Sequence, residues 1–357
     1  MAGLFESFHI KNVAIKNRIC VPPLVCYGWS DETGMVTEKN IEHYREIARG
    51  GAGLIIQEAT CVCKEGRLSW DQLGIWSDDH IPGLKKIVDA VHSEGVPVFL
   101  QIHHAGVLGV GGDLVAPSEY ACEHREQNKH AREMAEKEIY AVARLFIEAA
   151  QRAVKAGYDG VEIHGCHGYL LCEFTLKKYN KRNDEYGFDN IEDRYRFPLE
   201  VVRAVREAVG EDYPIYYRLG VNMDDIEDVK KGARMLEMAG VDVLDISSAF
   251  DASTSLEDKE HEFNEVVTSA KIIKENVNIP VIAVNRISTP DRAEKLLKEG
   301  YCDFTAIGRE LLSDYRWAYK AKNNIPINYC YHCKPKCKLN GGDNKCPNLI
   351  KNNETLY

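Results

Sequence analysis

The segment HGCHGYL, which begins at His164, contains two imidazoles and a phenol within six residues. The imidazoles of His164 and His167 can donate hydrogen bonds to an oxygen that gains negative charge. The phenol of Tyr169 can give up a proton only to a strongly basic, developing carbanion. A lone histidine in such a turn more often serves packing, but three polar groups together favour a catalytic site. This combination suits a carbonyl substrate.

A second group of reactive side chains lies in CYHCKPKCKLNGGDNKC, residues 330–346, where the spacing is C-x2-C-x3-C-x8-C. Disulfides, zinc and an iron–sulfur cluster are the candidate explanations. The N-terminus lacks the pattern of a signal peptide, so we expect a cytoplasmic protein whose thiols stay reduced. A metal is then the better interpretation, and the spacing alone leaves both zinc and iron–sulfur open. The four candidate ligands are Cys330, Cys333, Cys337 and Cys346.

A third pattern is the pairing of polar residues in VNRI and IGRE, near the end of two predicted strands. Asn285 with Arg286, and Gly308 with Arg309, offer backbone N–H groups and guanidinium groups to a phosphate dianion. In α/β barrels a phosphate site is often formed by the loops after the last two strands. Gly308 suits a tight turn equally well, so the pattern alone favours a phosphate site and a purely structural turn about equally.

The elements that must position these residues are eight short apolar runs separated by helical patterns. Near-continuous apolar runs are typical of parallel strands buried on both faces. Helical spacing follows the third run, where Val142, Leu145, Ala149 and Ala153 repeat ahead of Gly157. The pattern predicts a (β/α)8 barrel over residues 1–325 and a short cysteine-containing extension over 326–357. The predicted strands are 19–24, 53–59, 97–103, 160–165, 214–220, 241–247, 280–286 and 303–309.

Catalytic residues of such barrels lie at the carboxyl ends of the strands and in the loops that follow. The predicted strand ends carry Gln57 and Glu58, Gln101 with His103 and His104, Arg218, and Ser247 with Ser248, besides the groups named above. The longest connection, residues 107–136, exceeds the usual loop length and is a candidate substrate lid.

Composition excludes several classes of function. The 357 residues are 45% apolar and 28% charged, as in folded globular proteins, and the net charge is −10. Such a charge argues against a surface for nucleic acid or anionic membranes, and the sequence has no apolar run long enough to cross a bilayer. Small molecules or protein partners, including further copies of the chain, are the expected ligands.

Several motifs resemble those of the old yellow enzyme family of FMN-dependent oxidoreductases, from about Leu4 to Lys320. They are NRICVPPL, QIHHAG, APS, HGCHGYL, NKRNDEYG with EDRYRF, and IGRE, in this order. The resemblance implies FMN across the barrel mouth, with its phosphate near Asn285, Arg286, Gly308 and Arg309. The flavin ring would meet Pro23, Leu24, Ala59, Gln101 and Arg218, and the Arg218 guanidinium would stabilise the anionic reduced flavin.

The same resemblance assigns roles at the substrate. His164 and His167 resemble the pair that binds the substrate carbonyl, Tyr169 resembles the proton donor, and Tyr27 is a further candidate for substrate contact. Val25 occupies the position at which one branch has a flavin-modulating cysteine, so we expect FMN to be bound non-covalently. Cys166, between the two histidines, and Phe188, where the family usually has glycine, are expected to reshape the substrate pocket.

The cysteine-rich tail is similar to that of the 2,4-dienoyl-CoA reductase, enoate reductase and trimethylamine dehydrogenase branch. This implies a 4Fe-4S cluster on the four cysteines, with zinc as the rival. The chain reaches Tyr357 without a G-x-G-x-x-G unit, which predicts an external electron donor, either a redox partner protein or NAD(P)H. Cys61, Cys63 and Cys122 are expected to be isolated thiols.

The leading interpretation is an ene-reductase that transfers hydride from FMN to the activated C=C bond of an enone or enoyl compound. One alternative is an amine dehydrogenase or demethylase, which requires an aromatic pocket for a cationic amine, possible only if Tyr27 and Trp29 begin one. The other alternative is an electron-transfer subunit without a substrate of its own.

Overall fold

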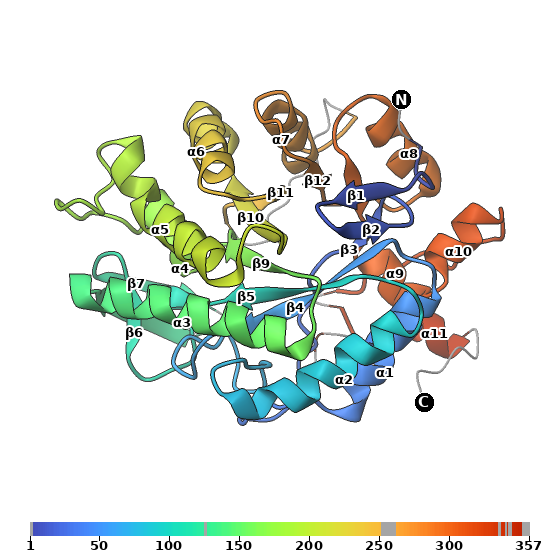
Figure 1. Ribbon diagram of the computed structural model, residues 1–357, viewed down its shortest axis with the longest axis horizontal. Helices are drawn as coiled ribbons and strands as arrows, with labels where there is room; N and C mark the ends of the chain where they lie inside the picture. The colour runs from blue at the N-terminus through green and yellow to red at the C-terminus, as the bar shows by residue number, and fades with distance from the viewer. Residues whose placement is uncertain are drawn as a thin grey trace.

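The computed structural model describes residues 3–124, 127–250, 262–334, 337–339, 341 and 345–351. Eight parallel strands close into a barrel surrounded by helices (Figure 1), which confirms the predicted (β/α)8 fold. Each strand pairs with the next along the chain, and the last pairs with the first. In chain order the strands are β3 (Ile19–Val21), β4 (Leu54–Cys61), β5 (Val98–His103), β9 (Gly160–Gly165), β10 (Ile215–Val221), β11 (Val243–Ser248), β12 (Val281–Ala283) and β13 (Phe304–Ala306).

The barrel strands form where apolar side chains are buried on both faces, as the sequence predicted. All eight residues of β4 are buried, and so are all six of β9. Strand β3 ends at Val21, three residues earlier than expected, because Pro22 and Pro23 follow and proline has no N–H for the ladder. Strands β12 and β13 are likewise shorter than the apolar runs that contain them.

Amphipathic helices cover the outside of the barrel (Figure 1). Helix α3 spans the predicted segment, buries Val142, Ala149 and Ala153, and ends at Gly157, whose φ of 91° is accessible to glycine without steric cost. The longer helices are α1 (Glu38–Arg49), α2 (Ile81–His92), α3 (Glu136–Ala156), α5 (Ile191–Val209), α6 (Ile226–Met238), α7 (Glu265–Lys274) and α8 (Pro290–Lys298). Shorter helices are α4 (Leu170–Thr175), α9 (Arg309–Ser313), α10 (Trp317–Lys322) and α11 (Pro347–Lys351).

A hairpin that the sequence did not predict precedes the barrel. Strands β1 (Phe8–Ile10) and β2 (Val13–Ile15) pair antiparallel. Their apolar residues pack in one buried cluster with the first residues of several barrel strands, and the Phe8 ring lies 5.2 Å from that of Phe304. The hairpin therefore closes the end of the barrel opposite the expected site.

The long connection 107–136, the candidate substrate lid, has secondary structure of its own. It contains a three-stranded sheet in which β8 (Gln127–Glu133) lies between β6 (Leu114–Ala116) and β7 (Tyr120–His124). Ala116 and Ala131 are fully buried in a cluster that includes Cys172 of α4. The connection thus forms a small packed subdomain beside the barrel (Figure 1).

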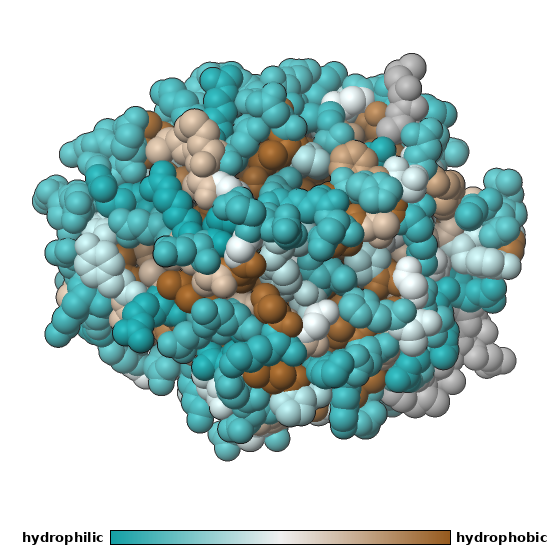
Figure 2. Space-filling model, in the orientation of Figure 1, coloured by the Kyte–Doolittle hydropathy of each residue, from teal (hydrophilic) through white to brown (hydrophobic). Residues whose placement is uncertain are grey.

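The described part of the tail packs against the barrel. Leu339 and Leu349 belong to the main hydrophobic core, and Asn348 donates hydrogen bonds to Ser313 Oγ (2.6 Å) and to the Asn328 carbonyl (3.0 Å). The face in Figure 2 is mostly hydrophilic, with apolar side chains in small scattered groups. None of the helices in the described residues has the length and apolar character that a membrane span requires.

Candidate active site

A tight turn after β9 brings the three predicted catalytic side chains together. His167 (φ 60°) and Gly168 (φ 67°) both have left-handed backbone conformations, and the His167 N–H donates to the Ser248 carbonyl at 3.0 Å. A left-handed histidine is uncommon and is often found at functional sites. The His164 ring centroid lies 5.3 Å from that of His167 and 5.0 Å from that of Tyr169. The predicted constellation therefore exists as a cluster of neighbouring rings.

His103, at the end of β5, completes this cluster. Its ring centroid is 4.5 Å from that of Tyr169 and 5.1 Å from that of His164, and its Nδ1 hydrogen-bonds with the Gln72 side chain at 3.2 Å. Sequence reasoning placed His103 at a strand end but gave it no role. The only signal available was the double histidine in QIHHAG, and the edge-to-face contact with Tyr169 was not predictable from it.

Burial keeps the imidazoles of this cluster uncharged at neutral pH. It lowers the pKa of His103 to about 3 and holds the pKa values of His164 and His167 well below the ordinary value, with nearby histidines and Arg218 contributing to the last two. A neutral imidazole still donates one N–H hydrogen bond. The site can therefore stabilise a developing oxyanion without holding a permanent positive charge on the histidines.

Arg218 lies next to His164 in the barrel wall, because the two residues are paired in register between β10 and β9. Its guanidinium is buried and its Nε is 3.3 Å from a carboxylate oxygen of Asp245. Gln101 is also buried, and its amide donates to Glu162 at 2.7 Å. Burial raises the pKa of both carboxyls, and the charge of Asp245 raises that of Glu162 further. Arg218 thus brings a buried positive charge to the floor of the mouth.

The predicted phosphate residues share an unusual backbone. Asn285 (φ 98°) and Arg286 (φ 54°) are consecutive non-glycine residues with positive φ, which is a costly conformation that concentrates at ligand sites. A side chain at Gly308 would meet only Pro22 and Leu24, at ordinary contact distances of 3.5 and 3.6 Å. The predicted ring contacts Pro23 and Ala59 are buried, whereas Leu24 is half-buried and Arg309 is exposed.

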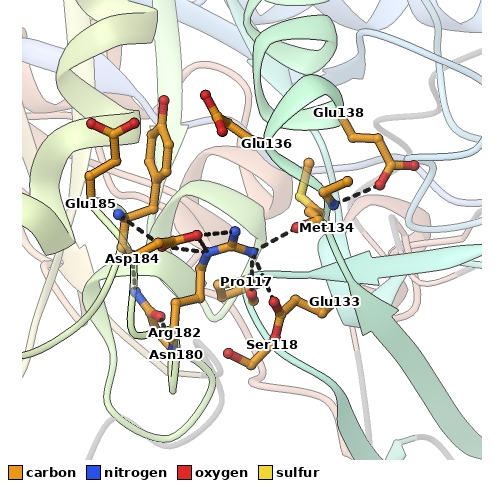
Figure 3. A network of polar contacts seen from close by, with 12 residues as sticks. Pro117, Ser118, Glu133, Met134, Glu136, Glu138, Asn180, Arg182, Asp184 and Glu185 are labelled. Atoms are coloured by element: carbon orange, nitrogen blue, oxygen red, sulfur yellow. Dashed lines mark hydrogen bonds and ion pairs between the residues drawn. The ribbon is translucent and has the colours of Figure 1, made fainter.

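The three-stranded sheet is attached to the site through Arg182 of the NKRNDEYG motif, as Figure 3 shows. The buried guanidinium donates to the carbonyls of Pro117 (2.9 Å) and Met134 (2.6 Å), which flank the last two strands of the sheet. The same guanidinium binds Asp184, with Nε at 2.9 Å from a carboxylate oxygen. Arg182, in the chain that follows α4, therefore holds the segment predicted as a lid at Pro117 and at Met134.

The four tail cysteines line a single pocket. Arg309, Leu312 and Ser313 of α9 form its barrel side. The Cys330 N–H donates to the buried carboxylate of Glu310 at 2.8 Å, which connects the first cysteine to α9. Cys330 and Cys346, which are 16 positions apart in sequence, thus line the same pocket as Arg309, one of the predicted phosphate residues.

The cysteine cavity also adjoins the loop after β3. Tyr27 forms an isolated β-bridge with Gly341 of the tail, so the candidate substrate residue lies against the cysteine segment. The pKa of the buried Cys26 thiol is raised by burial, by Glu58 and by Cys337, which places Cys337 beside that loop. Trp29 is buried and packs edge-to-face on His43 at 5.0 Å. Trp29 is therefore a core residue rather than the start of an aromatic pocket.

Cys61 and Cys63 are free thiols and belong to no candidate metal group among the described residues, but they contact each other. The Cys61 thiol donates to the Cys63 carbonyl at 2.9 Å and also to the Cys63 sulfur. Hydrogen bonds from Cys61, from His104 and from the Gly66 amide lower the pKa of Cys63 to about 4 in spite of its burial. Their spacing alone gave no sign of this, because the low pKa of Cys63 depends on the bend after β4 and on His104, which directly follows β5.

Comparisons with known proteins show what the chain is similar to. The family model described as NADH:flavin oxidoreductase / NADH oxidase matches residues 3–328. An NADH oxidase of Thermoanaerobacter brockii is 41% identical over 350 residues, which are 94% of this chain and 53% of that protein. The chain therefore spans about half the length of this relative.

Two solved structures have the same fold. A 2-naphthoyl-CoA reductase in complex with 2-naphthoyl-CoA has a TM-score of 0.88 at 27% identity, and the match covers 95% of this chain and 56% of that one. An old yellow enzyme homologue from Zymomonas mobilis has a TM-score of 0.80 at 28% identity, over 92% of this chain and 94% of that one.

Proposed function

Because the chain belongs to the NADH:flavin oxidoreductase / NADH oxidase family of FMN-dependent enzymes, we propose that it is an ene-reductase. Its substrate is an α,β-unsaturated carbonyl compound, either an enone or an enoyl thioester. The observation that carries this proposal is the cluster of His164, His167 and Tyr169 at the mouth of the barrel. The thioester possibility is supported by the similarity to 2-naphthoyl-CoA reductase.

Each residue of the cluster has a defined role in this proposal. The neutral imidazoles of His164 and His167 donate hydrogen bonds to the substrate carbonyl oxygen, and these bonds strengthen as that oxygen becomes an enolate. Tyr169 delivers a proton to the α-carbon, and the His103 ring holds the phenol ring by edge-to-face contact. FMN, when bound, supplies the hydride for the β-carbon.

The residues proposed for FMN fit such a ligand. The Arg218 guanidinium is buried, with its Nε beside Asp245, and its positive charge suits an anionic ring edge. The strained backbone at Asn285 and Arg286, with Gly308 exposing its main chain without a side chain, suits a phosphate that approaches the main chain closely. Pro23, Leu24, Ala59 and Gln101 would face the ring, and Arg309 the phosphate. We propose non-covalent binding, because Val25 stands where a linking cysteine would be.

The role of Tyr169 is tested by separating the two half-reactions. Tyr169→Phe keeps the ring and removes only the proton, so oxidation of the reduced flavin by 2-cyclohexenone should slow by about 10² to 10⁴-fold. Flavin reduction should be almost unchanged. Stopped-flow absorbance measures each rate separately, and Tyr186→Phe is the matched control because the Tyr186 phenol binds Glu200 on α5, away from the cluster.

Two results would contradict the assignment. If Tyr169→Phe slowed both half-reactions equally, the phenol would be a structural group and not the proton donor. If Tyr186→Phe produced the same selective loss, the effect would reflect general loosening of the fold. Weaker binding of phenolic ligands after His164→Ala or His167→Ala would support the proposed oxyanion site independently of turnover.

We also propose that Cys330, Cys333, Cys337 and Cys346 hold a 4Fe-4S cluster, and that residues 326–357 are its binding segment. Among the described residues, no three of these sulfurs lie within 4.8 Å of one another. A tetrahedral zinc site with Zn–S bonds of about 2.3 Å requires sulfurs about 3.8 Å apart. The wider spacing, around a shared cavity, supports the larger group, which would supply single-electron transfer.

Protein purified without oxygen provides the test of this site. We expect about four iron and four sulfide per chain, with a broad absorbance near 400 nm besides the flavin bands. Cys333→Ala should remove the iron and sulfide, whereas Cys122→Ala, on the distant strand β7, should leave both in place. Stoichiometric zinc without sulfide would show that the site is a structural zinc centre.

The electron donor that we propose is NAD(P)H, with a separate redox protein as the second candidate. Relatives named NADH oxidase and NADPH dehydrogenase support NAD(P)H as the donor. The cysteine cavity beside Arg309 supports entry of single electrons from a partner protein. Anaerobic flavin reduction by NADH, by NADPH and by reduced ferredoxin, measured with and without Cys333→Ala, distinguishes the donors. Efficient reduction without any response to an added alkene would favour the electron-transfer alternative instead.

A further inference from the structure

A thiol lies between the two catalytic imidazoles and has no part in the reaction proposed above. Cys166 is fully buried, and its Sγ lies 3.8 Å from His164 Nδ1. His164, Cys166 and His167 each present one potential ligand atom, and these three atoms all lie within 4.8 Å of one another. Carbonyl binding by imidazoles and proton delivery by a phenol need no thiol at this position.

The separation of these atoms is close to that of zinc ligands. In a tetrahedral site with Zn–S of about 2.3 Å and Zn–N of about 2.0–2.1 Å, sulfur and nitrogen are about 3.6 Å apart. The contact between Cys166 and His164 already has nearly this length, and the other separations, which are at most 4.8 Å, need to shorten by at most about 1.5 Å.

We propose that His164, Cys166 and His167 form a Zn²⁺ site in the substrate pocket, with the fourth coordination position left to water or another ligand. Two nitrogens and one sulfur are a ligand set that suits Zn²⁺, and three protein ligands are typical of an accessible zinc site. When the metal binds, the Cys166 thiol releases its proton to solvent and the S–Zn bond forms. No oxidation or reduction is involved.

The local structure holds the ligands in place before the metal arrives. The left-handed backbone at His167 and Gly168 fixes the turn, and the His167 N–H is bound to the Ser248 carbonyl. His167 Nε2 hydrogen-bonds with Ser247 Oγ at 2.8 Å, which leaves the other ring nitrogen for a metal. Such an outer partner is a regular feature of zinc-bound histidines, because it orients the ring.

Zinc at this site has a functional consequence that rests on the proposed reaction. Both imidazoles that bind the substrate oxygen would be engaged by the metal, so Zn²⁺ should inhibit in competition with the substrate. His167 is the most exposed of the three ligands, so the metal enters from the barrel mouth, by the same route as the substrate. The activity of the enzyme is therefore sensitive to zinc at this site.

The test compares zinc binding by the holoenzyme and by two thiol variants. Calorimetric titration with ZnCl2 should give one more bound zinc for the wild-type enzyme than for Cys166→Ala. Cys172→Ala is the matched control: its thiol is buried nearby on α4 but is directed at the Ala249 carbonyl, 3.3 Å away. The tail cysteines are intact in all three proteins, so their contribution cancels in the comparison.

X-ray absorption at the zinc edge identifies the ligands, and the difference between wild type and Cys166→Ala should show sulfur with two nitrogens. Equal zinc stoichiometry in these two proteins, or a difference without sulfur, would overturn the proposal. Cys166→Ser, which keeps the volume of the side chain, gives the same comparison if the alanine variant folds poorly. Zinc that binds through Cys166 yet leaves turnover unchanged would support the metal site and refute the substrate role of the histidines.

Discussion

Replacement of Arg182 by alanine should release the three-stranded sheet from the barrel. The guanidinium is buried, and its two bonds to the carbonyls of Pro117 and Met134 connect segments that lie 65 and 48 residues away along the chain. Both carbonyls belong to buried residues, so the truncation leaves two acceptors without their donor. Asp184 is about half exposed and can be solvated by water when its partner is removed.

The expected loss of local stability follows from these contacts. A hydrogen bond from a charged donor contributes about 1.5–3 kcal/mol, so the loss of two of them should lower the local stability by about 3–6 kcal/mol. Since about 1.4 kcal/mol corresponds to a factor of ten, local opening should become about 10² to 10⁴-fold more frequent. The effect should be confined to residues 114–134, because the barrel strands do not depend on these bonds.

Hydrogen exchange followed by mass spectrometry measures this opening peptide by peptide. Amides of β6 and β8 should exchange faster in Arg182→Ala, while those of β4 and β9 should be unchanged. Arg132→Ala is the matched control, because Arg132 lies on β8 and binds Asp113 and Glu138 but has a side chain that is 43% exposed. Exposed ion pairs contribute little, so exchange in this control should rise by less than about tenfold.

Two outcomes would refute the reasoning. Unchanged exchange of residues 114–134 in Arg182→Ala would mean that apolar packing alone holds the sheet. An equal effect of Arg132→Ala would mean that the number of ion pairs, rather than their burial, determines the anchoring.

Three further predictions concern other sites. The depressed pKa of Cys63, about 4, predicts that its alkylation by iodoacetamide is independent of pH between 6 and 9; a tenfold rise per pH unit would contradict the thiolate. Burial raises the pKa of Glu58 from 4.5 to about 7, so the stability it contributes is complete below pH 4.5 and is lost as pH rises through 7. Between pH 5 and 8 the unfolding free energy of the wild type should therefore fall by about 3 kcal/mol more than that of Glu58→Gln, as measured by urea denaturation. An equal fall in both proteins would show that Glu58 is not the source of this pH dependence. Arg309→Ala should weaken binding of FMN to the apoprotein by about 10- to 150-fold in a fluorescence titration, the worth of one charge-assisted contact, whereas exposed Arg316→Ala should have no effect.

Local patterns in the sequence determined the elements and the closely spaced groups of this protein. The eight apolar runs predicted eight buried strands, because a parallel strand covered on both faces must be apolar at almost every position. His164, His167 and Tyr169 were predicted to act together because they lie on one turn, and residues within one turn stay close in any fold that forms it. The extent of β3 was misjudged where two prolines limit the ladder.

Contacts between distant elements were decided only by the tertiary structure. His103 joins Tyr169, and His104 joins Cys63, because the register of β5 beside β4 and β9 brings their ends to one rim. The sheet in residues 107–136 is held by Arg182, which follows β9 in the sequence. The short strands of the sheet gave too weak a pattern to predict it from residues 107–136 alone. Spacing along the chain specifies neighbours over a few residues, whereas neighbours across strands depend on register and packing, which the sequence encodes only through the whole fold.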